Sequence, residues 1–481
     1  MIGARYMTKS KNKIQINFFG EAANDVTGSC IHIKTTNRQI LLECGTFQSC
    51  GSTLENYKIN NRHFDFKPKD IDYVFLMHNH VDHIGLTPKL YRNGSTAQII
   101  APNGTREIAE ILLKDSAHIM ETDVLELSNK FKRDYIPIYT ESDVDRCLNH
   151  YTEYPIGEMI QLDEYVKFRF VPSGHILNSA QLELWVTEGN TTKKIGYTSD
   201  LGNLHIKKYY TNIFEPITKC DVLIGETTYA REDRIANQRM RNKDLEKLEA
   251  AIRQTCVENR SRLLIPVFAN DRCQNMLTYI FDIFGEDDNF NIPVLIDSPM
   301  AMRVCMAYRE LLEGPDAEKW HQVLSWKNVR FVEDAVESRG WRDSNQPVIV
   351  LASSGMMVRG RSTAWAHSML PRTNDRIVFC GFAAENSLAS IIKEGKQKTI
   401  TVSGHRVKNK CQVTDLHSFS SHMQRDSLLK VYGATECEKI VLVHGEMNGK
   451  IEFSKHLQEV ISKNNNTSKV VVANKGYTLS I

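Results

Sequence analysis

One short segment constrains this chain more than any other part of its sequence: the run His-Asn-His-Val-Asp-His at residues 78–83, directly after an apolar stretch typical of a buried β-strand. Three histidines beside an aspartate make poor core material, and the imidazoles would repel one another if they were protonated. Metal ligation explains the segment better than a structural cluster does. A loop leaving a strand can aim His78 and His80 at one ion. The turn that follows can present Asp82 and His83 to a second ion.

Candidate ligands also stand at the ends of later predicted strands. His175, Asp200 and His444 follow the predicted strands at 166–171, 194–198 and 439–443. Each of them taken alone is a weak indication. A carboxylate can be shared between two cations, and metal pairs about 3.5–4 Å apart serve many hydrolases. Asp200 is therefore the candidate bridge between two ions.

The pattern of predicted elements changes twice along the chain. Short strands dominate residues 14–76 and 166–224, and these two stretches are typical of two sheets packed face to face. From about Ala230 long polar helices alternate with short apolar strands, which indicates a parallel α/β domain. Near His417 the first pattern returns. We therefore predict three segments, of which the third completes the first: 1–229, an inserted domain at 230–415, and 416–481.

Composition limits the class of protein. The chain of 481 residues is 41% hydrophobic and 25% charged, which is typical of a globular protein with large cores. Its net charge of +2 requires any basic groove to be local. No run approaches the ~18 apolar residues of a membrane span, and no signal-peptide core follows the basic start, which predicts a cytoplasmic protein without a membrane partner. The 11 cysteines form no Cys-x-x-Cys pair and are expected as free or buried thiols.

These features, in this order, resemble the metallo-β-lactamase superfamily over nearly the whole chain. Two early segments, Asp-Val-Thr-Gly-Ser-Cys at 25–30 and Leu-Glu-Cys-Gly-Thr-Phe-Gln at 42–48, resemble the openings of β-CASP ribonucleases, which include bacterial RNA-processing nucleases and the pre-mRNA 3′-end cleavage endonuclease. The resemblance implies an α/β fold, namely a metallo-β-lactamase αββα sandwich with an inserted parallel α/β β-CASP domain. It also implies a metal-dependent hydrolase of ester bonds that acts on single-stranded RNA. A homodimer is left open.

The resemblance implies two zinc ions per chain. One is held by His78, His80, His175 and Asp200, and the other by Asp82, His83, Asp200 and His444. Iron-binding flavodiiron relatives usually carry Glu where this chain has His80, which favours zinc. Glu43 stands where the family usually has an Asp that orients a metal-bound histidine, so the surroundings of the ligands are expected to be rearranged. Gln424 and Asn386 also depart from the family's usual Asp and Gly.

Three β-CASP signatures occur in order: an acidic motif with Glu226, a motif Phe-Ser-Ser-His that ends at His422, and a third motif with His444. His422 is not a ligand in the assignment above. Phosphodiester hydrolysis needs a proton donor for the leaving oxygen, and histidine is the side chain that titrates closest to neutrality. We predict that His422 is this general acid, kept protonated by Glu226, and that Asp82 serves catalysis as a metal ligand. A buried, hydrogen-bonded histidine is the structural alternative.

The expected mechanism is hydrolysis by a hydroxide that two zinc ions generate and direct in line at phosphorus. By resemblance the products carry a 5′-phosphate and a 3′-hydroxyl, and cleavage is endonucleolytic, 5′ exonucleolytic or both. The inserted domain would cap the cleft and leave a slot that suits a single strand. Backbone phosphates are expected to contact residues of that domain: Ser353, Ser354 and Gly355, helped by Arg272, Arg359 and Arg361. For each arginine alone, a solvated surface charge is about as good an explanation.

Three other functions remain open. A DNA nuclease of the same branch is the nearest, but the third motif of those relatives generally carries Val where this chain has His444. A small-molecule hydrolase would have little use for the large insertion. A non-catalytic β-CASP scaffold would typically have lost metal ligands. The natural RNA, its sequence preference and the oligomeric state cannot be predicted from the sequence.

Overall fold

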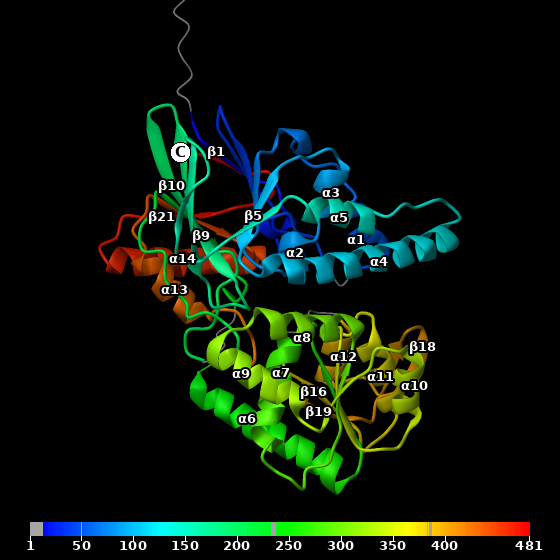
Figure 1. Cartoon of the computed structure of the whole chain (residues 1–481). Helices are drawn as coiled ribbons and strands as arrows, with labels where there is room; N and C mark the ends of the chain where they lie inside the picture. Colours follow the sequence, from blue (N-terminus) through cyan, green and yellow to red (C-terminus); the bar gives the residue numbers. More distant parts are fainter. Residues whose placement is uncertain (1–12, 50, 207, 232–236, 382, 384–386) are drawn as a thin grey trace, which may run out of the picture.

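The chain forms two stacked lobes (Figure 1). The computed structural model describes residues 13–49, 51–206, 208–231, 237–381, 383 and 387–481. The upper lobe contains both the beginning and the end of the described chain, and the lower lobe is built from its middle. Asn386, one of the departures from the family pattern, lies outside the described residues, as does the basic start at 1–12.

Two seven-stranded sheets form the upper lobe. The first sheet runs in the order β22 (Thr478–Ser480), β1 (Gln15–Phe18), β2 (Ile31–Lys34), β3 (Gln39–Leu42), β4 (Tyr73–Phe75), β5 (Gln98–Pro102) and β6 (Tyr151–Tyr154). The second runs in the order β21 (Lys469–Val472), β20 (Lys439–Val443), β11 (Val222–Glu226), β10 (Thr191–Tyr197), β9 (Ala180–Glu188), β8 (Val166–Pro172) and β7 (Met159–Gln161). Both chain ends therefore contribute strands to the same lobe.

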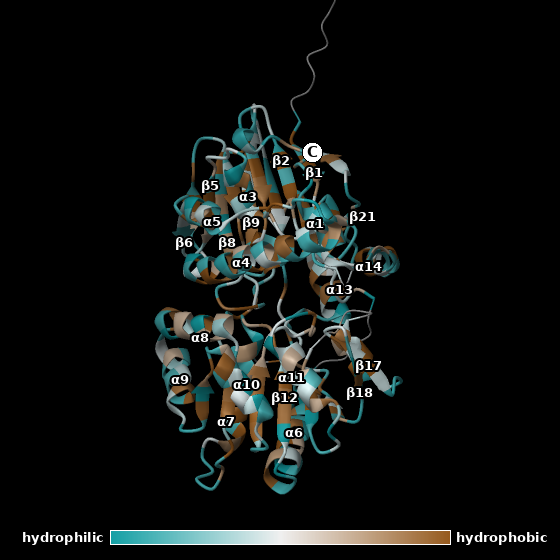
Figure 2. Ribbon diagram, turned by 90° about the vertical axis from the view of Figure 1, so that its right-hand side faces the viewer, coloured by the Kyte–Doolittle hydropathy of each residue, from teal (hydrophilic) through white to brown (hydrophobic). Residues whose placement is uncertain are grey.

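The two sheets pack face to face over an apolar core. Their inward side chains come from alternate positions, as in Phe168 and Phe170 of β8, because successive residues of a strand point to opposite faces. Phe75 of β4 meets Phe168 edge to face, with ring centroids 5.1 Å apart. Figure 2 shows these hydrophobic strands at the centre of the lobe.

Helices cover the outer face of each sheet. The first sheet packs against α3 (Thr87–Arg92), α4 (Thr105–Phe131) and α5 (Glu141–Leu148). The second packs against α13 (Arg425–Ala434) and α14 (Met447–Lys463). The upper lobe is thus the predicted αββα sandwich. Short elements complete it: η1 (Glu21–Ala23), α1 (Thr53–Asn60), η2 (Pro68–Asp70) and α2 (Val81–Ile84).

The lower lobe is a parallel α/β domain, as the sequence predicts. Its six parallel strands have the order β14 (Val329–Phe331), β13 (Val294–Asp297), β15 (Val348–Ala352), β12 (Arg262–Pro266), β16 (Arg376–Phe379) and β19 (Gln412–Asp415). One face packs against α6 (Gln238–Ile252), α7 (Arg272–Phe284), α8 (Pro299–Leu311) and α9 (Gly314–Ser325). Near the other face lie α10 (Ala335–Asp343), α11 (Arg361–Met369), α12 (Leu388–Glu394) and a hairpin of β17 (Thr399–Val402) and β18 (His405–Lys408). The boundaries at 229/230 and 415/416 stay predictions.

Two helices differ in their bounds from what the sequence pattern indicates. A helical pattern is notable in the sequence at 105–113, but α4 continues to Phe131, with its later turns largely exposed. The helix predicted at 242–259 begins earlier, and its last part is a π-helix at Arg253–Glu258. Among the described residues, none of these helices is both long enough and apolar enough to cross a membrane.

Candidate metal centre

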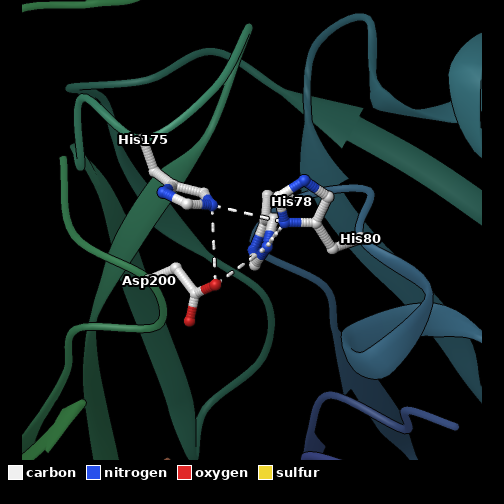
Figure 3. Close-up of side chains that lie close together, drawn as sticks. All are labelled: His78, His80, His175 and Asp200. Atoms are coloured by element: carbon white, nitrogen blue, oxygen red, sulfur yellow. Dashed lines mark hydrogen bonds and ion pairs between the residues drawn. The ribbon is translucent and has the colours of Figure 1, made fainter. Parts of the chain in front are cut away.

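Four predicted ligands meet where three loops leave the two sheets (Figure 3). His78 and His80 lie between β4 and α2, while His175 follows β8. Asp200 follows β10. His80 Nδ1 lies 3.2 Å from His78 Nε2 and 3.3 Å from His175 Nε2. Asp200 Oδ2 lies 3.6 Å and 3.5 Å from the same two nitrogens, so all four ligand atoms face one point.

A second group of predicted ligands lies beside the first and shares Asp200 with it. His83 Nε2 lies 3.1 Å from His444 Nε2, and Asp82 Oδ2 lies 3.7 Å and 3.5 Å from these nitrogens. Asp200 Oδ1 lies 3.4 Å from His83 Nε2 and 3.6 Å from His444 Nε2. Because its two oxygens are turned toward different histidine groups, Asp200 is in position to bridge two ions.

The spacing and the chemistry of these donors fit a metal. Zn–N bonds of about 2.0–2.1 Å in a tetrahedron place neighbouring ligand atoms about 3.3–3.4 Å apart, and the observed separations scatter around that value. Burial lowers the pKa of His78 and His175, and that of His80 to about 4, so these rings offer lone pairs rather than charge. Asp200 Oδ1 is buried without a hydrogen bond from the described residues, which leaves it for a cation.

Glu43 contacts the candidate ligand His83 through the ring nitrogen that does not face the metal centre. Its Oε2 accepts hydrogen bonds from His83 Nδ1 at 2.5 Å and from Tyr197 Oη at 2.6 Å, and its Oε1 accepts one from Ser199 Oγ at 2.8 Å. A carboxylate on Nδ1 fixes the ring so that Nε2 points toward the metal. By distance alone Glu43, His78 and His83 could also hold an ion. Three hydrogen bonds already occupy this carboxylate, so we assign it to positioning.

Close backbone packing explains the glycine in the early segment at 42–48. A Cβ on Gly45 would lie only 1.6 Å from the carbonyl oxygen of Asp82. The Ser29 N–H donates to that same carbonyl at 2.9 Å, and the Gly45 N–H donates to Ser29 O at 2.8 Å. The segments at 25–30 and 42–48 therefore hold the loop of Asp82 and His83 through backbone contacts.

His422 lies between the metal centre and Glu226. Its Nδ1 is 3.5 Å from Glu226 Oε1, its Nε2 is 4.0 Å from Asp200 Oδ2, and its side chain is 20% exposed. Glu226 is buried, and its oxygens accept hydrogen bonds from the N–H groups of Leu201 at 3.0 Å and Thr228 at 2.9 Å. One ring nitrogen thus faces a fixed carboxylate and the other faces the centre, which suits the predicted proton donor.

The predicted phosphate-binding loop follows β15 in the lower lobe. Ser353 Oγ lies 2.5 Å from Ser298 Oγ, and Ser354 Oγ donates to Arg359 O at 3.1 Å. Gly355 and Arg272 line one small hollow, together with Pro266, Phe268, Phe379, Cys380 and Gly381. Hydrogen bonds of Ser353 and Ser354 to other residues of the lower lobe fix this loop. Its contact with RNA stays a prediction.

The three predicted arginines all have partners within the protein. Arg272 is buried, whereas the side chains of Arg361 and Arg359 are 20% and 41% exposed. Their partners are Ser421 Oγ at 3.5 Å from Arg272, Asp297 Oδ1 at 2.6 Å from Arg361, and Asp123 of α4 beside Arg359. Arg359 therefore joins the two lobes, and of the three it is the most accessible to a phosphate.

Two supporting residues, Thr228 and Lys208, stand in no sequence pattern that marks them. Thr228 Oγ1 lies 3.0 Å from His444 Nδ1, whereas the acidic motif that contains Thr228 indicates a role only for Glu226. Lys208 Nζ lies 2.6 Å from Asp271 Oδ1 and donates to the carbonyl of His175 at 2.6 Å. It also donates to Ser421 Oγ at 2.8 Å, which in turn donates to Asp271 Oδ2 at 2.9 Å. This pair, of which Asp271 is buried and Lys208 is partly buried, joins the lobes beside the metal centre.

Lys208→Met is expected to destabilise the protein by about 3–5 kcal/mol, because the buried Asp271 carboxylate loses its cation. Burial lowers the pKa of Lys208 to about 8 against the opposing effect of Asp271, so at neutral pH the amine is still mainly charged. Chemical denaturation of both proteins would measure the loss. Adding Asp271→Asn should recover part of it. Equal stability of Lys208→Met and the parent would show that the pair does not hold the lobes together.

Two histidine–carboxylate groups that share one aspartate, at the edge of an αββα sandwich, define a metal-dependent hydrolase. Three family models match the chain: "Metallo-beta-lactamase superfamily" at 23–158, "Beta-Casp domain" at 273–392 and "Zn-dependent metallo-hydrolase RNA specificity domain" at 406–468. The chain belongs to the β-CASP family of the metallo-β-lactamase superfamily.

Similar proteins come from several branches of life. The transcription termination factor FttA of Methanocaldococcus jannaschii is 27% identical, over 94% of this chain and 70% of that protein. Ribonuclease TTHA0252 of Thermus thermophilus is 29% identical, over 88% and 92%. Integrator complex subunit 11 of Gallus gallus is 24% identical, over 90% and 69%. A solved structure of a protein of unknown function from Enterococcus faecalis shares the fold, with 11% identity, a TM-score of 0.55 and coverage of 98% and 100%.

Proposed function

We propose that this chain is a ribonuclease that hydrolyses phosphodiester bonds of single-stranded RNA with two zinc ions per chain. The observation that carries the proposal is the pair of ligand groups joined by the two oxygens of Asp200, with His422 beside them and outside both groups. Hydrolysis with a separate proton donor needs a partly exposed histidine that lies beside the metal ligands without being one of them.

Different residues would bind the metals, orient the ligand rings and donate the proton. Zinc ions held by the two groups would lower the pKa of a water and neutralise phosphate charge. Glu43, Tyr197 and Ser199 keep the ligand rings oriented. His422 would donate a proton to the leaving oxygen from Nε2, and Glu226 would hold the ring through Nδ1. After the donation the same histidine can take a proton from water and return to its starting state.

Single-stranded RNA is the proposed substrate. The family model over residues 406–468 is described as an RNA specificity domain, and a relative is named a ribonuclease. The metal centre lies on the side of the upper lobe that meets the lower lobe, because His175 contacts Lys208 and Lys208 contacts Asp271. A substrate between the lobes would be confined, which favours one strand over a duplex. A cytoplasmic location and a homodimer stay predictions.

Cleavage of single-stranded RNA should be faster than cleavage of DNA of the same sequence, since the third motif carries His444. Matched labelled oligonucleotides, incubated with zinc-loaded protein, would measure the ratio of kcat/KM. An Asp200→Asn variant controls for contaminating nucleases, because it loses the shared ligand. Equal or faster turnover of DNA would favour the DNA-nuclease alternative, and no cleavage of either would favour a scaffold.

A further inference from the structure

The β17–β18 hairpin lies at one side of the lower lobe (Figure 2), and its sequence is rich in cationic residues. Residues 396–410 contain five cationic side chains, His405, and no aspartate or glutamate: Lys396, Lys398, Arg406, Lys408 and Lys410. Because this segment contributes +5 to a whole-chain charge of +2, the rest of the chain carries −3. The hairpin is thus a basic surface on an otherwise slightly acidic protein.

Strand pairing and a tight turn fix the backbone positions of the hairpin's cationic residues. The strands pair so that Thr401 lies opposite Arg406 and Thr399 lies opposite Lys408, on the outer face. Hydroxyls and cations alternate across that face, and both are donors to phosphate oxygens. Ser403 and Gly404 at the turn have φ angles of 50° and 82°, the two positive values of a type I′ turn, which matches the twist of the strands.

The inner face of the hairpin is part of the core. Ile400, Val402 and Val407 are buried in the cluster that includes Trp365 of α11 and Met357. Met357 lies just after the loop at 353–355 that is predicted to hold phosphate. The inner face of the hairpin therefore packs in the same cluster as a residue that follows this loop, and the geometry of the outer face is set by packing rather than by its charges.

The charges of the hairpin are free to meet a ligand. In the described part of the chain, Lys398, Arg406, Lys408 and Lys410 have no carboxylate within ion-pair distance. The two lysines before them are paired: Lys393 with Asp415 at 2.9 Å and Lys396 with Glu394 at 3.3 Å. Arg406 and Lys408 are exposed, and both project from the outer face. Unpaired cations on a rigid surface release counterions when they bind a polyanion, which favours binding.

We propose that the outer face of the β17–β18 hairpin binds the phosphodiester backbone of single-stranded RNA outside the metal centre. This inference rests on the proposed ribonuclease function and extends it, because it predicts a preference for RNA long enough to reach both places. A backbone contact carries no base information, so the preference should depend on length and salt rather than on sequence.

The test replaces the four free cations by glutamine: Lys398→Gln, Arg406→Gln, Lys408→Gln and Lys410→Gln. These changes leave the buried side unchanged, and an unaltered thermal unfolding midpoint would verify the fold. For an RNA of about 30 nucleotides, KM should rise about tenfold or more with kcat unchanged. The slope of log KM against log salt should fall by up to about 2.8, because each cation that no longer neutralises a phosphate lowers it by roughly 0.7. An RNA of about six nucleotides should be cleaved as by the parent.

A matched control removes four exposed lysines of the upper lobe: Lys219→Gln, Lys455→Gln, Lys463→Gln and Lys469→Gln. It changes the net charge equally and should affect both RNAs little. A hairpin variant whose KM rises no more than that of this control, or rises equally on short RNA, overturns the inference. Unchanged RNA affinity together with abolished binding of polyglutamate would assign the hairpin to an acidic protein segment and would also overturn it.

Failure of the proposed function gives a different result. In that case the parent cleaves no RNA of either length. Fluorescence anisotropy of the long RNA with both variants, over the same salt series, then tests the hairpin by itself. Weaker binding by the hairpin variant alone supports the surface, and equal binding by all three proteins rejects it.

Discussion

His422→Ala should lower kcat on an ordinary RNA phosphodiester by about 10²- to 10⁴-fold while both metals stay bound, because general acid catalysis contributes that much. Its Nε2 faces the metal centre at 4.0 Å from Asp200, and its Nδ1 faces Glu226 at 3.5 Å. It belongs to neither ligand group among the described residues. Steady-state cleavage and metal analysis of the same protein sample would measure both effects.

A substrate whose leaving group needs no proton separates this role from a structural one. His422→Ala should cleave a phosphodiester with a strongly acidic leaving group almost as fast as the parent does. Glu226→Gln should lose less activity than His422→Ala on ordinary RNA, since the amide still occupies the position beside the ring. Loss of metal, or equal impairment on both substrates, would mean that His422 is structural or a ligand.

His80→Ala should remove metal and most activity together. Its Nδ1 lies 3.2 Å and 3.3 Å from the ligand nitrogens of His78 and His175, so the variant leaves an incomplete first group. We expect occupancy to fall from two ions to about one and kcat to fall below about 1% of the parent value, because the second ion alone supplies only part of the charge stabilisation. Elemental analysis after gel filtration would measure the metal.

Glu43→Gln is the matched control for this variant. Glu43 accepts a hydrogen bond from His83 but is not a ligand of either proposed ion. Replacing it by glutamine should therefore weaken metal binding only about 10- to 100-fold. Excess zinc should restore its activity and should not restore that of His80→Ala. Full occupancy in His80→Ala would contradict the assignment of the first group, and one ion or none in the parent would contradict a binuclear centre.

The ligand groups could be predicted because their residues are marked locally. His78, His80, Asp82 and His83 share one loop, and the remaining three ligands each follow a strand that the apolar pattern reveals. Strand ends of packed sheets converge on one edge, so a prediction of strands is also a prediction of proximity. The same reasoning gave the two packed sheets and the parallel lobe, whereas the αββα sandwich was implied by the family resemblance.

Contacts that depend on tertiary packing could not be predicted in this way. Lys208 and Asp271 belong to different lobes, and neither stands in a ligand-like pattern, so only the fold brings them within 2.6 Å. Arg359 was predicted to face RNA, but its pairing with Asp123 depends on how far α4 extends. The exposed later turns of α4 lack a continuous apolar stripe, which is why the sequence pattern ended too early.

Metal-dependent cleavage of labelled single-stranded RNA tests the central claim most directly. The purified protein is stripped with a chelator, dialysed and titrated with zinc, and the initial rate is measured at each ratio. We predict no cleavage by the stripped protein, a rate that reaches its plateau at about two zinc ions per chain, and no cleavage by Asp200→Asn at any ratio. Cleavage that survives chelation, or RNA that stays intact with the fully loaded parent protein, would contradict the account.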